Sequence, residues 1–354
     1  MTLLPKSIFD TPRRAVYLSN DKLTVYHWKD GKLGSSYLFD DSEDGRRYFD
    51  RYLKESPKLT TYMLVDVVEE EFRQDKVPHV TGSDHKSVIE RKKNRMFRDT
   101  PYFHAEVQGR EEEGRKDDRV LFMALTNPDI IEPWIRLLDD NKVPLAGIYS
   151  LPQVTRIILK NLEKPPSDHQ LLVSLQSISG LRQTFFQKGK MKISRLVGLP
   201  RYGTEPYAPI INEEVELIQR YLNSLRLIDT DNPLDIYYLG DRTLLDELDR
   251  IQTDSQSMRH HRVDLAEYCR REGIDTEITN PFSDHVFVYH LLKKKPKNTY
   301  AVEHERRYFK LKAARQFMYA ASAFMFIAGF VWSGLNLMEG LLNKQKSIVA
   351  EKKT

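Results

Sequence analysis

Short runs of β-forming residues alternate with turn residues in two separate parts of the chain. The first set lies within residues 15–39, where AVYL, LTVYHW and GSSYLF are broken by SND and KDGK. The second begins at residue 169, where HQLLVSLQ, LRQTFFQKG and KMKISRLV are separated by SISG and KGK. Turn residues between β-forming runs are typical of antiparallel strands. Each set predicts a strand meander, and the recurrence indicates an internal duplication.

A different pattern separates the two meanders. TYMLV predicts a strand, SVIERKKNRMFRD a strongly basic helix, and YFHAEVQ and RVLFMAL two paired strands. Asn127 and Pro128 suit the start of a further helix, which has apolar residues on one face. The strand PLAGIYS follows this helix. Together these segments predict a small inserted α+β domain over residues 60–150.

The second meander is followed by alternating helices and strands. Apolar residues recur at intervals of three and four, as in a long amphipathic helix, at Ile211, Val215, Ile218, Leu222 and Leu225. We then expect the strand LDIYYLG, the helix RTLLDELDRI, the strand HHRVDL and the helix FSDHVFVYHLL. This order is typical of an α/β domain.

One apolar run without charge, FMYAASAFMFIAGFVWSGLNLM, covers residues 317–338. At about 1.5 Å per residue, a helix of this length can cross a hydrocarbon core of about 30 Å. A buried core helix is the alternative, although such helices seldom run so long without a charge. The residues assigned to the membrane helix are Phe317, Tyr319, Phe324, Phe326, Trp332 and Met338.

Composition and charge narrow the classes of protein. The 354 residues are enough for two or three folded units, and a net charge of +4 argues little for a nucleic-acid partner. The single cysteine, Cys269, excludes an intramolecular disulfide. Basic residues are denser before the apolar run than after it, and no secretory signal is recognisable. We therefore expect a single-pass protein whose large N-terminal domain is cytoplasmic.

This order of elements resembles the actin-like ATPase fold. It comprises two halves that each begin with a strand meander, a small insertion after the first meander, and then a helix, a strand, a Gly-containing loop and a helix. More narrowly, the chain resembles the PilM and GspL proteins of type IV pilus and type II secretion assembly platforms. EEVELIQRYLNSLRLIDTDNPLDIYYLGDRTLLDEL is similar to their helix, strand and adenosine-side loop. WIRLLDDNKVPLAGIYSLPQVTRIIL resembles the end of their inserted domain and the return to the first half. The likeness is one of pattern rather than identity.

This resemblance implies an α/β fold: a duplicated actin-like (ribonuclease H-like) ATPase fold with an inserted small α+β domain, followed by one transmembrane helix. The expected units are part of the first half (1–59), the inserted domain (60–150), a return helix (151–169), the second half (170–296), a basic juxtamembrane linker (297–316), the transmembrane helix (317–338) and a short tail (339–354).

The resemblance also implies where a nucleotide would bind. Actin-like ATPases hold phosphates with two hairpin loops, each with an acidic residue near Mg²⁺ and a glycine. The corresponding turns here contain neither the expected carboxylates nor the expected glycine, and the third loop keeps one glycine. The vestigial nucleotide loops comprise Ser19, Asn20, Asp21, Ser174, Gln176, Gly240 and Asp241. We expect no catalytic residue, no metal and no cofactor, and leave ATP binding open, because phosphoryl transfer needs metal and charge stabilisation.

Two basic clusters are candidates for contact with anionic lipid or with an acidic partner. The first comprises Arg91, Lys92, Lys93, Arg95 and Arg98, and the second comprises Lys293, Lys294, Lys295 and Lys297. For the first cluster, a solvated helix face is the competing interpretation. For the second, which lies closer to the membrane helix along the chain, we favour a lipid-facing role.

The sequence leaves two classes of function. In the first, the chain is a non-catalytic scaffold in a bacterial inner membrane. It would dock a motor ATPase (the secretion ATPase), PilN/PilO-like or GspM-like membrane subunits, or both, and a homodimer is left open. In the second, it is a membrane-tethered actin-like nucleotide-binding ATPase or kinase. The altered phosphate loops favour the scaffold.

Overall fold

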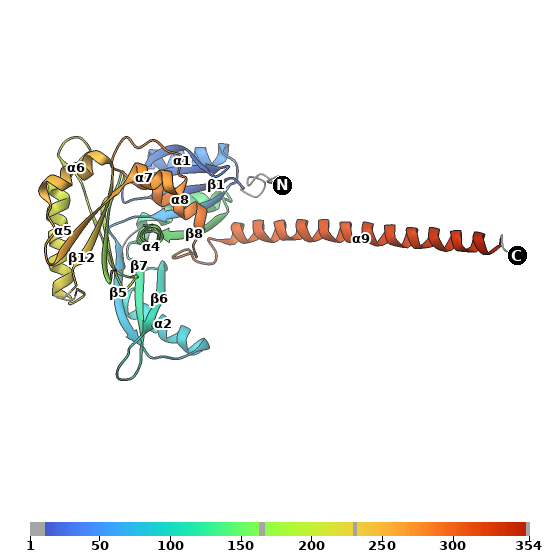
Figure 1. Cartoon of the computed structure of the whole chain (residues 1–354), viewed down its shortest axis with the longest axis horizontal. Coiled ribbons are helices and arrows are strands. Elements are labelled where there is room, and N and C mark those ends of the chain that lie inside the picture. Colours follow the sequence, from blue (N-terminus) through green and yellow to red (C-terminus); the bar gives the residue numbers. More distant parts are fainter. Residues whose placement is uncertain (1–10, 163–166, 229–231, 352–354) are drawn as a thin grey trace. The chain divides into compact units, whose positions relative to one another are not determined.

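Two five-stranded sheets with the same topology form the centre of the folded part of the chain (Figure 1). The computed structural model describes residues 11–162, 167–228 and 232–351, and the chain divides into two units, Met1–Arg306 and Arg307–Thr354. The outermost parts of the predicted first half and tail, residues 1–10 and 352–354, lie outside the described residues.

The first sheet has the strand order β3-β2-β1-β4-β8. Its antiparallel meander consists of β1 (Arg13–Leu18), β2 (Lys22–Lys29) and β3 (Lys32–Asp40). Parallel to β1 run β4 (Thr60–Val65) and then β8 (Leu145–Ser150). The helices of this half are α1 (Glu43–Glu55), α3 (Glu132–Asp140), which follows a single 3₁₀ turn (Pro128–Ile130), and α4 (Leu151–Asn161).

The second sheet repeats this plan in the order β11-β10-β9-β12-β13. Its meander is β9 (His169–Gln176), β10 (Gly180–Gln187) and β11 (Lys190–Val197), with β12 (Leu234–Gly240) and β13 (Met258–Asp264) parallel to β9. Its helices are α5 (Tyr207–Ser224), α6 (Arg242–Ile251) and α7 (Leu265–Glu272). The matching order of the two sheets confirms the duplicated fold.

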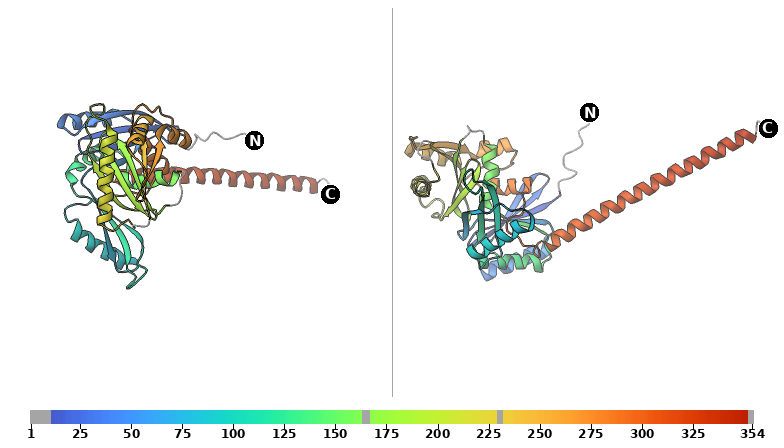
Figure 2. Two further views of the ribbon diagram at one scale, coloured as in Figure 1. Left: turned by 60° about the vertical axis from the view of Figure 1, so that its left-hand side comes forward. Right: turned by 90° about the horizontal axis from the view of Figure 1, so that it is seen from below.

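The helix α8 (Asp284–Lys294) returns the chain to the first half, where it contacts α4, β1 and β4. On the second half, α5 lies beside the sheet (Figure 2), and apolar side chains of α5 and α6 pack against those of β9, β10 and β12. The buried face of α5 contains four of the five residues that its periodicity predicted. The fifth, Leu225, is instead 46% exposed, because the helix ends at Ser224.

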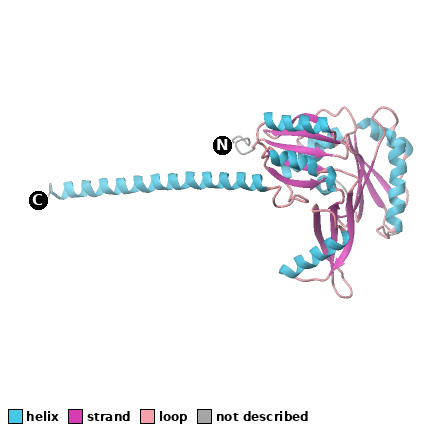
Figure 3. Cartoon of the chain, turned by 180° about the vertical axis from the view of Figure 1, so that it is seen from behind, coloured by secondary structure: helices cyan, strands magenta, loops and turns pink. Residues whose placement is uncertain are grey.

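The inserted unit is smaller than the sequence predicted. It contains β5 (Glu70–Val77), α2 (Gly82–Met96), β6 (Phe103–Arg110) and β7 (Asp118–Leu125), with the sheet order β5-β7-β6 (Figure 3). Apolar side chains of α2 pack against this sheet around Phe122. The predicted bounds of residues 60–150 are corrected, because β4 and β8 at the two ends pair within the first sheet.

The unit Arg307–Thr354 contains one long helix, α9 (Arg307–Glu351). Its segment Arg307–Asn343 is long and apolar enough to cross a membrane, and none of its most apolar window is buried. Phe317 is 75% exposed and Trp332 71% exposed. The helix therefore extends the predicted membrane span, residues 317–338, at both ends, and includes part of the predicted linker and tail.

Candidate functional site at the junction between the two halves

The hairpins that correspond to phosphate loops meet directly across the two halves. The β9–β10 turn carries Ser179, whose hydroxyl lies 2.9 Å from the hydroxyl of Tyr17 on β1. Both hydroxyls also hydrogen-bond to the same carboxylate oxygen of Asp66, which follows β4. Hydrogen bonds among these three side chains thus connect the two hairpins.

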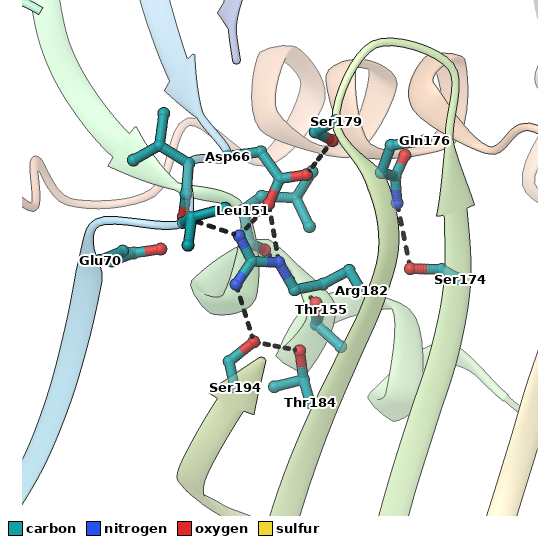
Figure 4. Close-up of polar contacts among 12 residues, drawn as sticks. Asp66, Glu70, Leu151, Thr155, Ser174, Gln176, Ser179, Arg182, Thr184 and Ser194 are labelled. Carbon is teal, nitrogen blue, oxygen red and sulfur yellow. Dashed lines mark hydrogen bonds and ion pairs between the residues drawn. The ribbon is translucent and has the colours of Figure 1, made fainter. Parts of the chain in front are cut away.

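The centre of the junction is a buried ion pair between Asp66 and Arg182 (Figure 4). The Nε of Arg182, on β10, donates to Oδ1 of Asp66 at 2.7 Å, and a terminal nitrogen contacts the same oxygen. The side chains are 0% exposed for Asp66 and 2% exposed for Arg182. Burying two charges is tolerated only when they are paired and hydrogen-bonded, so this contact holds the halves in a defined arrangement.

Further polar contacts complete the environment of Arg182. Its guanidinium donates to the carbonyl oxygen of Val67 at 3.3 Å and to the hydroxyl of Ser194 at 3.4 Å. Ser194 in turn lies 2.9 Å from the hydroxyl of Thr184 (Figure 4). The arginine therefore joins the end of the first sheet to two strands of the second.

A second buried carboxylate, Asp284 at the start of α8, holds the β9–β10 turn. It accepts hydrogen bonds from the backbone N–H and hydroxyl of Ser177 at 2.9–3.1 Å. Burial raises the pKa of Asp284 to about 6, and the Ser177 hydrogen bonds act in the opposite direction by favouring the ionised form. The hydrogen bonds of this carboxylate therefore stabilise the conformation of the β9–β10 turn.

The structure places the three predicted residues of the first loop in different surroundings. Ser19 bonds to the backbone of Lys22 within its own turn. Asn20 accepts from the N–H of Val68, at the entry to the inserted unit. Asp21 is exposed. The assignment of these residues to a vestigial nucleotide loop stays a prediction.

The predicted residues of the other loops also have local partners. Gln176 donates to the hydroxyl of Ser174 at 3.0 Å (Figure 4). Asp241 accepts from the N–H of Leu244 at 3.2 Å and so caps α6. Gly240 lies against that helix, since a Cβ there would come within 2.9 Å of the Leu244 side chain. The structure brings Ser174 and Gln176 together, while Gly240 and Asp241 belong to the start of α6.

Sequence reasoning missed the residues that form the junction, namely Tyr17, Asp66, Ser179, Arg182 and Asp284. One signal was present: Arg182 lies between Leu181 and the Phe185-Phe186 pair in the predicted strand LRQTFFQKG, which is an interior strand of its sheet. A charge buried in such a strand requires a counter-charge. The sequence does not reveal that the partner lies 116 positions away.

The first part of the predicted basic linker is a docked segment, which we call the strap (residues 298–306), and the rest belongs to α9. The N–H groups of Thr299 and Tyr300 both donate to the carbonyl oxygen of Ile148, on the edge strand β8, at 3.0 Å. Asn298 accepts from the N–H of Ile148 at 2.9 Å. Gly147 permits this approach, because a Cβ there would lie 2.7 Å from the Asn298 side chain. The strap therefore covers the open edge of the first sheet.

Two buried hydrogen bonds attach the strap to the base of the inserted unit. Tyr300 donates to Glu70 at 2.6 Å, and Tyr102 donates to Glu305 at 3.0 Å. Burial raises the pKa of Glu70 to about 7 and also raises the pKa of Glu305. The chain is thus fixed to two parts of the folded unit immediately before α9 begins.

The two basic clusters remain largely at the surface. Within the first, Lys92 pairs with Asp75 and Lys93 with Glu90, whereas the arginines at positions 91, 95 and 98 are exposed. The second cluster ends α8, and the residues at positions 293, 294, 295 and 297 are all exposed. Their predicted contact with lipid or a partner stays a prediction. In the described ranges, no cluster of three His, Cys, Asp or Glu side chains is arranged to hold a metal.

No family model and no curated protein matches this sequence. Solved structures do match. PilM from a PilM–PilN type IV pilus biogenesis complex is similar with a TM-score of 0.56 and 12% identity, covering 80% of this chain and 99% of that chain. The cytoplasmic domain of EpsL, an inner membrane component of the type II secretion system of Vibrio cholerae, has a TM-score of 0.42 at 10% identity, with coverages of 82% and 97%.

A further match is a protein with an actin-like ATPase fold from Bacteroides thetaiotaomicron, with a TM-score of 0.44 at 8% identity and coverages of 80% and 95%. Together with the duplicated sheets, the similarity to PilM shows that this chain has an actin-like fold. The expected resemblance is confirmed for PilM at the level of the fold.

Proposed function

We propose that this chain is a non-catalytic, membrane-anchored scaffold of a pilus or secretion assembly platform. The PilM-like fold supports this role, since the similar PilM is described in a biogenesis complex with PilN. The proposed partners are PilN/PilO-like or GspM-like membrane subunits and the secretion ATPase.

The proposal that the chain is non-catalytic rests on the junction between the two halves, where the two hairpins are hydrogen-bonded to each other. In an actin-like ATPase, the phosphates lie between the two hairpins and a metal is held near carboxylates. Here the hairpins bond to each other through Tyr17, Ser179 and Asp66, and the Asp66 carboxylate is neutralised by Arg182. A carboxylate engaged in this way is a poor ligand for Mg²⁺, which requires oxygen donors in near-octahedral geometry.

The anchoring part rests on α9 and its flanking charges. The uncharged run of α9, residues 317–338, is long enough to span a hydrocarbon core and follows five basic residues at positions 306, 307, 310, 312 and 315, which favours a cytoplasmic folded domain at the inner membrane. The exposed second basic cluster supports a lipid-facing role, since a basic side chain near an anionic surface contributes about 1 kcal/mol.

The competing function is a membrane-tethered nucleotide-binding ATPase or kinase. Calorimetric titration of the full chain in detergent with ATP, with and without Mg²⁺, separates the two. We expect no Mg²⁺-dependent binding and no ATP turnover above the buffer rate, because the two hairpins hydrogen-bond to each other and the Asp66 carboxylate is paired with Arg182. Mg²⁺-dependent turnover that is lost in Asp21→Asn, an exposed residue of the first hairpin, would establish the enzyme instead.

A further inference from the structure

A groove of about 770 Å³ lies between the inserted unit and the second half. Its walls are β5 on one side, β11 on the other, and the outer face of α5. The groove is separate from the junction at Asp66 and Arg182, and its volume falls within the range of about 300–1,000 Å³ typical of ligand pockets.

The α5 wall of the groove is an exposed apolar stripe. Leu217 and Tyr221 lie one turn apart on α5 and Leu225 directly follows the helix; the three side chains are 38%, 51% and 46% exposed. The adjoining face of the same helix, which begins at Ile218 beside Leu217, is buried in the core of the second half. The stripe thus extends the apolar surface of α5 beyond the part that the core covers, and another apolar segment can cover it.

The remaining walls are two sheet edges. β11 ends the second sheet and β5 ends the inserted sheet, so each pairs with a strand on one side only. An open edge presents backbone donors and acceptors to an incoming strand. The strap makes a limited contact of this kind, because the N–H groups of Thr299 and Tyr300 both donate to the carbonyl oxygen of Ile148 on the edge strand β8.

The groove is lined by a buried cationic side chain, that of Lys192. Lys192, on β11, is 8% exposed, and its ammonium donates at 3.1 Å to the neutral side-chain oxygens of Gln74 and Gln108. Burial and the nearby charges of Arg119 and Lys190 lower the pKa of Lys192. The charge of Glu111 acts in the opposite direction, but the hydrogen-bond partners that the described residues give this ammonium are the two neutral amide oxygens. A carboxylate on a ligand would provide the counter-charge.

We propose that this groove binds an extended peptide segment of a second protein, with apolar side chains against α5 and an acidic side chain paired with Lys192. The edge strands fix the extended backbone, the exposed stripe selects apolar residues, and the buried ammonium selects the acidic one. This peptide site extends beyond the scaffold role, which does not specify where or how a partner binds.

A photocrosslinker tests the occupant directly. The full chain is expressed in its native cell with p-benzoylphenylalanine in place of Tyr221, and the cross-linked peptide is sequenced by mass spectrometry. The matched control carries the same group at Tyr48, a tyrosine of α1 that is 52% exposed. We expect an adduct at position 221 with an apolar segment of another protein that contains Asp or Glu. An adduct with a second copy of this chain, or none above the control, would overturn the proposal.

The cross-linked segment, made as a synthetic peptide, then tests the mode of binding to the full chain in detergent. We expect Lys192→Gln and Tyr221→Asp each to weaken binding about tenfold or more, and Tyr48→Asp to leave it unchanged. Amides of β11 should exchange more slowly in the complex. Binding that is indifferent to both groove variants would contradict the proposal. If platform subunits still co-purify in that case, the scaffold role stands without the groove.

Discussion

Replacing Arg182 with methionine is expected to lower the free energy of unfolding of the folded unit by about 3–5 kcal/mol. Methionine leaves the Asp66 carboxylate buried without its counter-charge, and loss of one partner of a buried pair costs about this much. Urea unfolding of the full chain in detergent, followed by the circular dichroism of its aromatic residues, measures the effect.

A partly exposed ion pair provides the control for Arg182→Met. Arg195 pairs with Glu214 at 2.5 Å, but its side chain is 41% exposed, so Arg195→Met is expected to cost at most about 1 kcal/mol. In Asp66→Asn/Arg182→Met both charges are absent, and we expect it to be more stable than Arg182→Met alone. Equal losses in the two single arginine variants would contradict the structural role of the junction.

The second large effect is a pH dependence of stability at Glu70. Burial raises the pKa of this carboxyl to about 7 in the folded chain, against an ordinary value of 4.5. Between these values the folded chain binds more protons than the unfolded chain, so stability falls as the pH rises. This difference between the folded and unfolded pKa corresponds to about 3 kcal/mol of unfolding free energy, and that stabilisation is lost between pH 4.5 and 7.

Glu70→Gln is expected to remove this part of the pH dependence. Relative to the variant, the native chain should lose about 3 kcal/mol between pH 4.5 and 8, measured by urea unfolding across that range. The control is Glu71→Gln, since Glu71 is the next residue on β5, is 43% exposed and pairs with Arg73. Parallel pH profiles for the native chain and Glu70→Gln would show that the Glu70 carboxyl is not held in the buried environment beside Tyr300.

Much of the fold follows from local pattern. The two meanders, the long helix α5 and the apolar part of α9 each have a periodicity or a length that only one kind of element explains. The bounds of the inserted unit could not be read in this way. β4 and β8 are apolar runs that would look the same in either sheet, and only their pairing assigns them to the first.

The strand β5 was missed for a different reason. Its sequence, EEFRQDKV, is mostly polar because several of its side chains face solvent, and such an edge strand has little apolar alternation. The strap was predicted as a linker because its buried groups, Tyr300 and Glu305, find their partners in distant parts of the chain. Their sequence neighbours give no sign of this pairing.

At the candidate site, too, the sequence predicted the local features but not the contacts between residues that are far apart in the chain. The Gly240-Asp241 pair predicted a loop for a nucleotide, yet the same two residues are what a tight strand-to-helix connection with an N-cap requires. The contact between Asp66 and Arg182 joins the two halves of a duplicated fold, so only the folded chain brings it together. Local signals alone therefore located the loops without showing what fills the space between them.

The scaffold role is tested most directly by identifying the proteins that bind the chain in its native membrane. The full chain, carrying an affinity tag, is purified from cross-linked native membranes beside an untagged control, and the bound proteins are identified by mass spectrometry. We expect membrane subunits of a pilus or secretion platform, together with its motor ATPase, to be enriched with the tagged chain. Repeated recovery of the chain without any such subunit would contradict the proposed function.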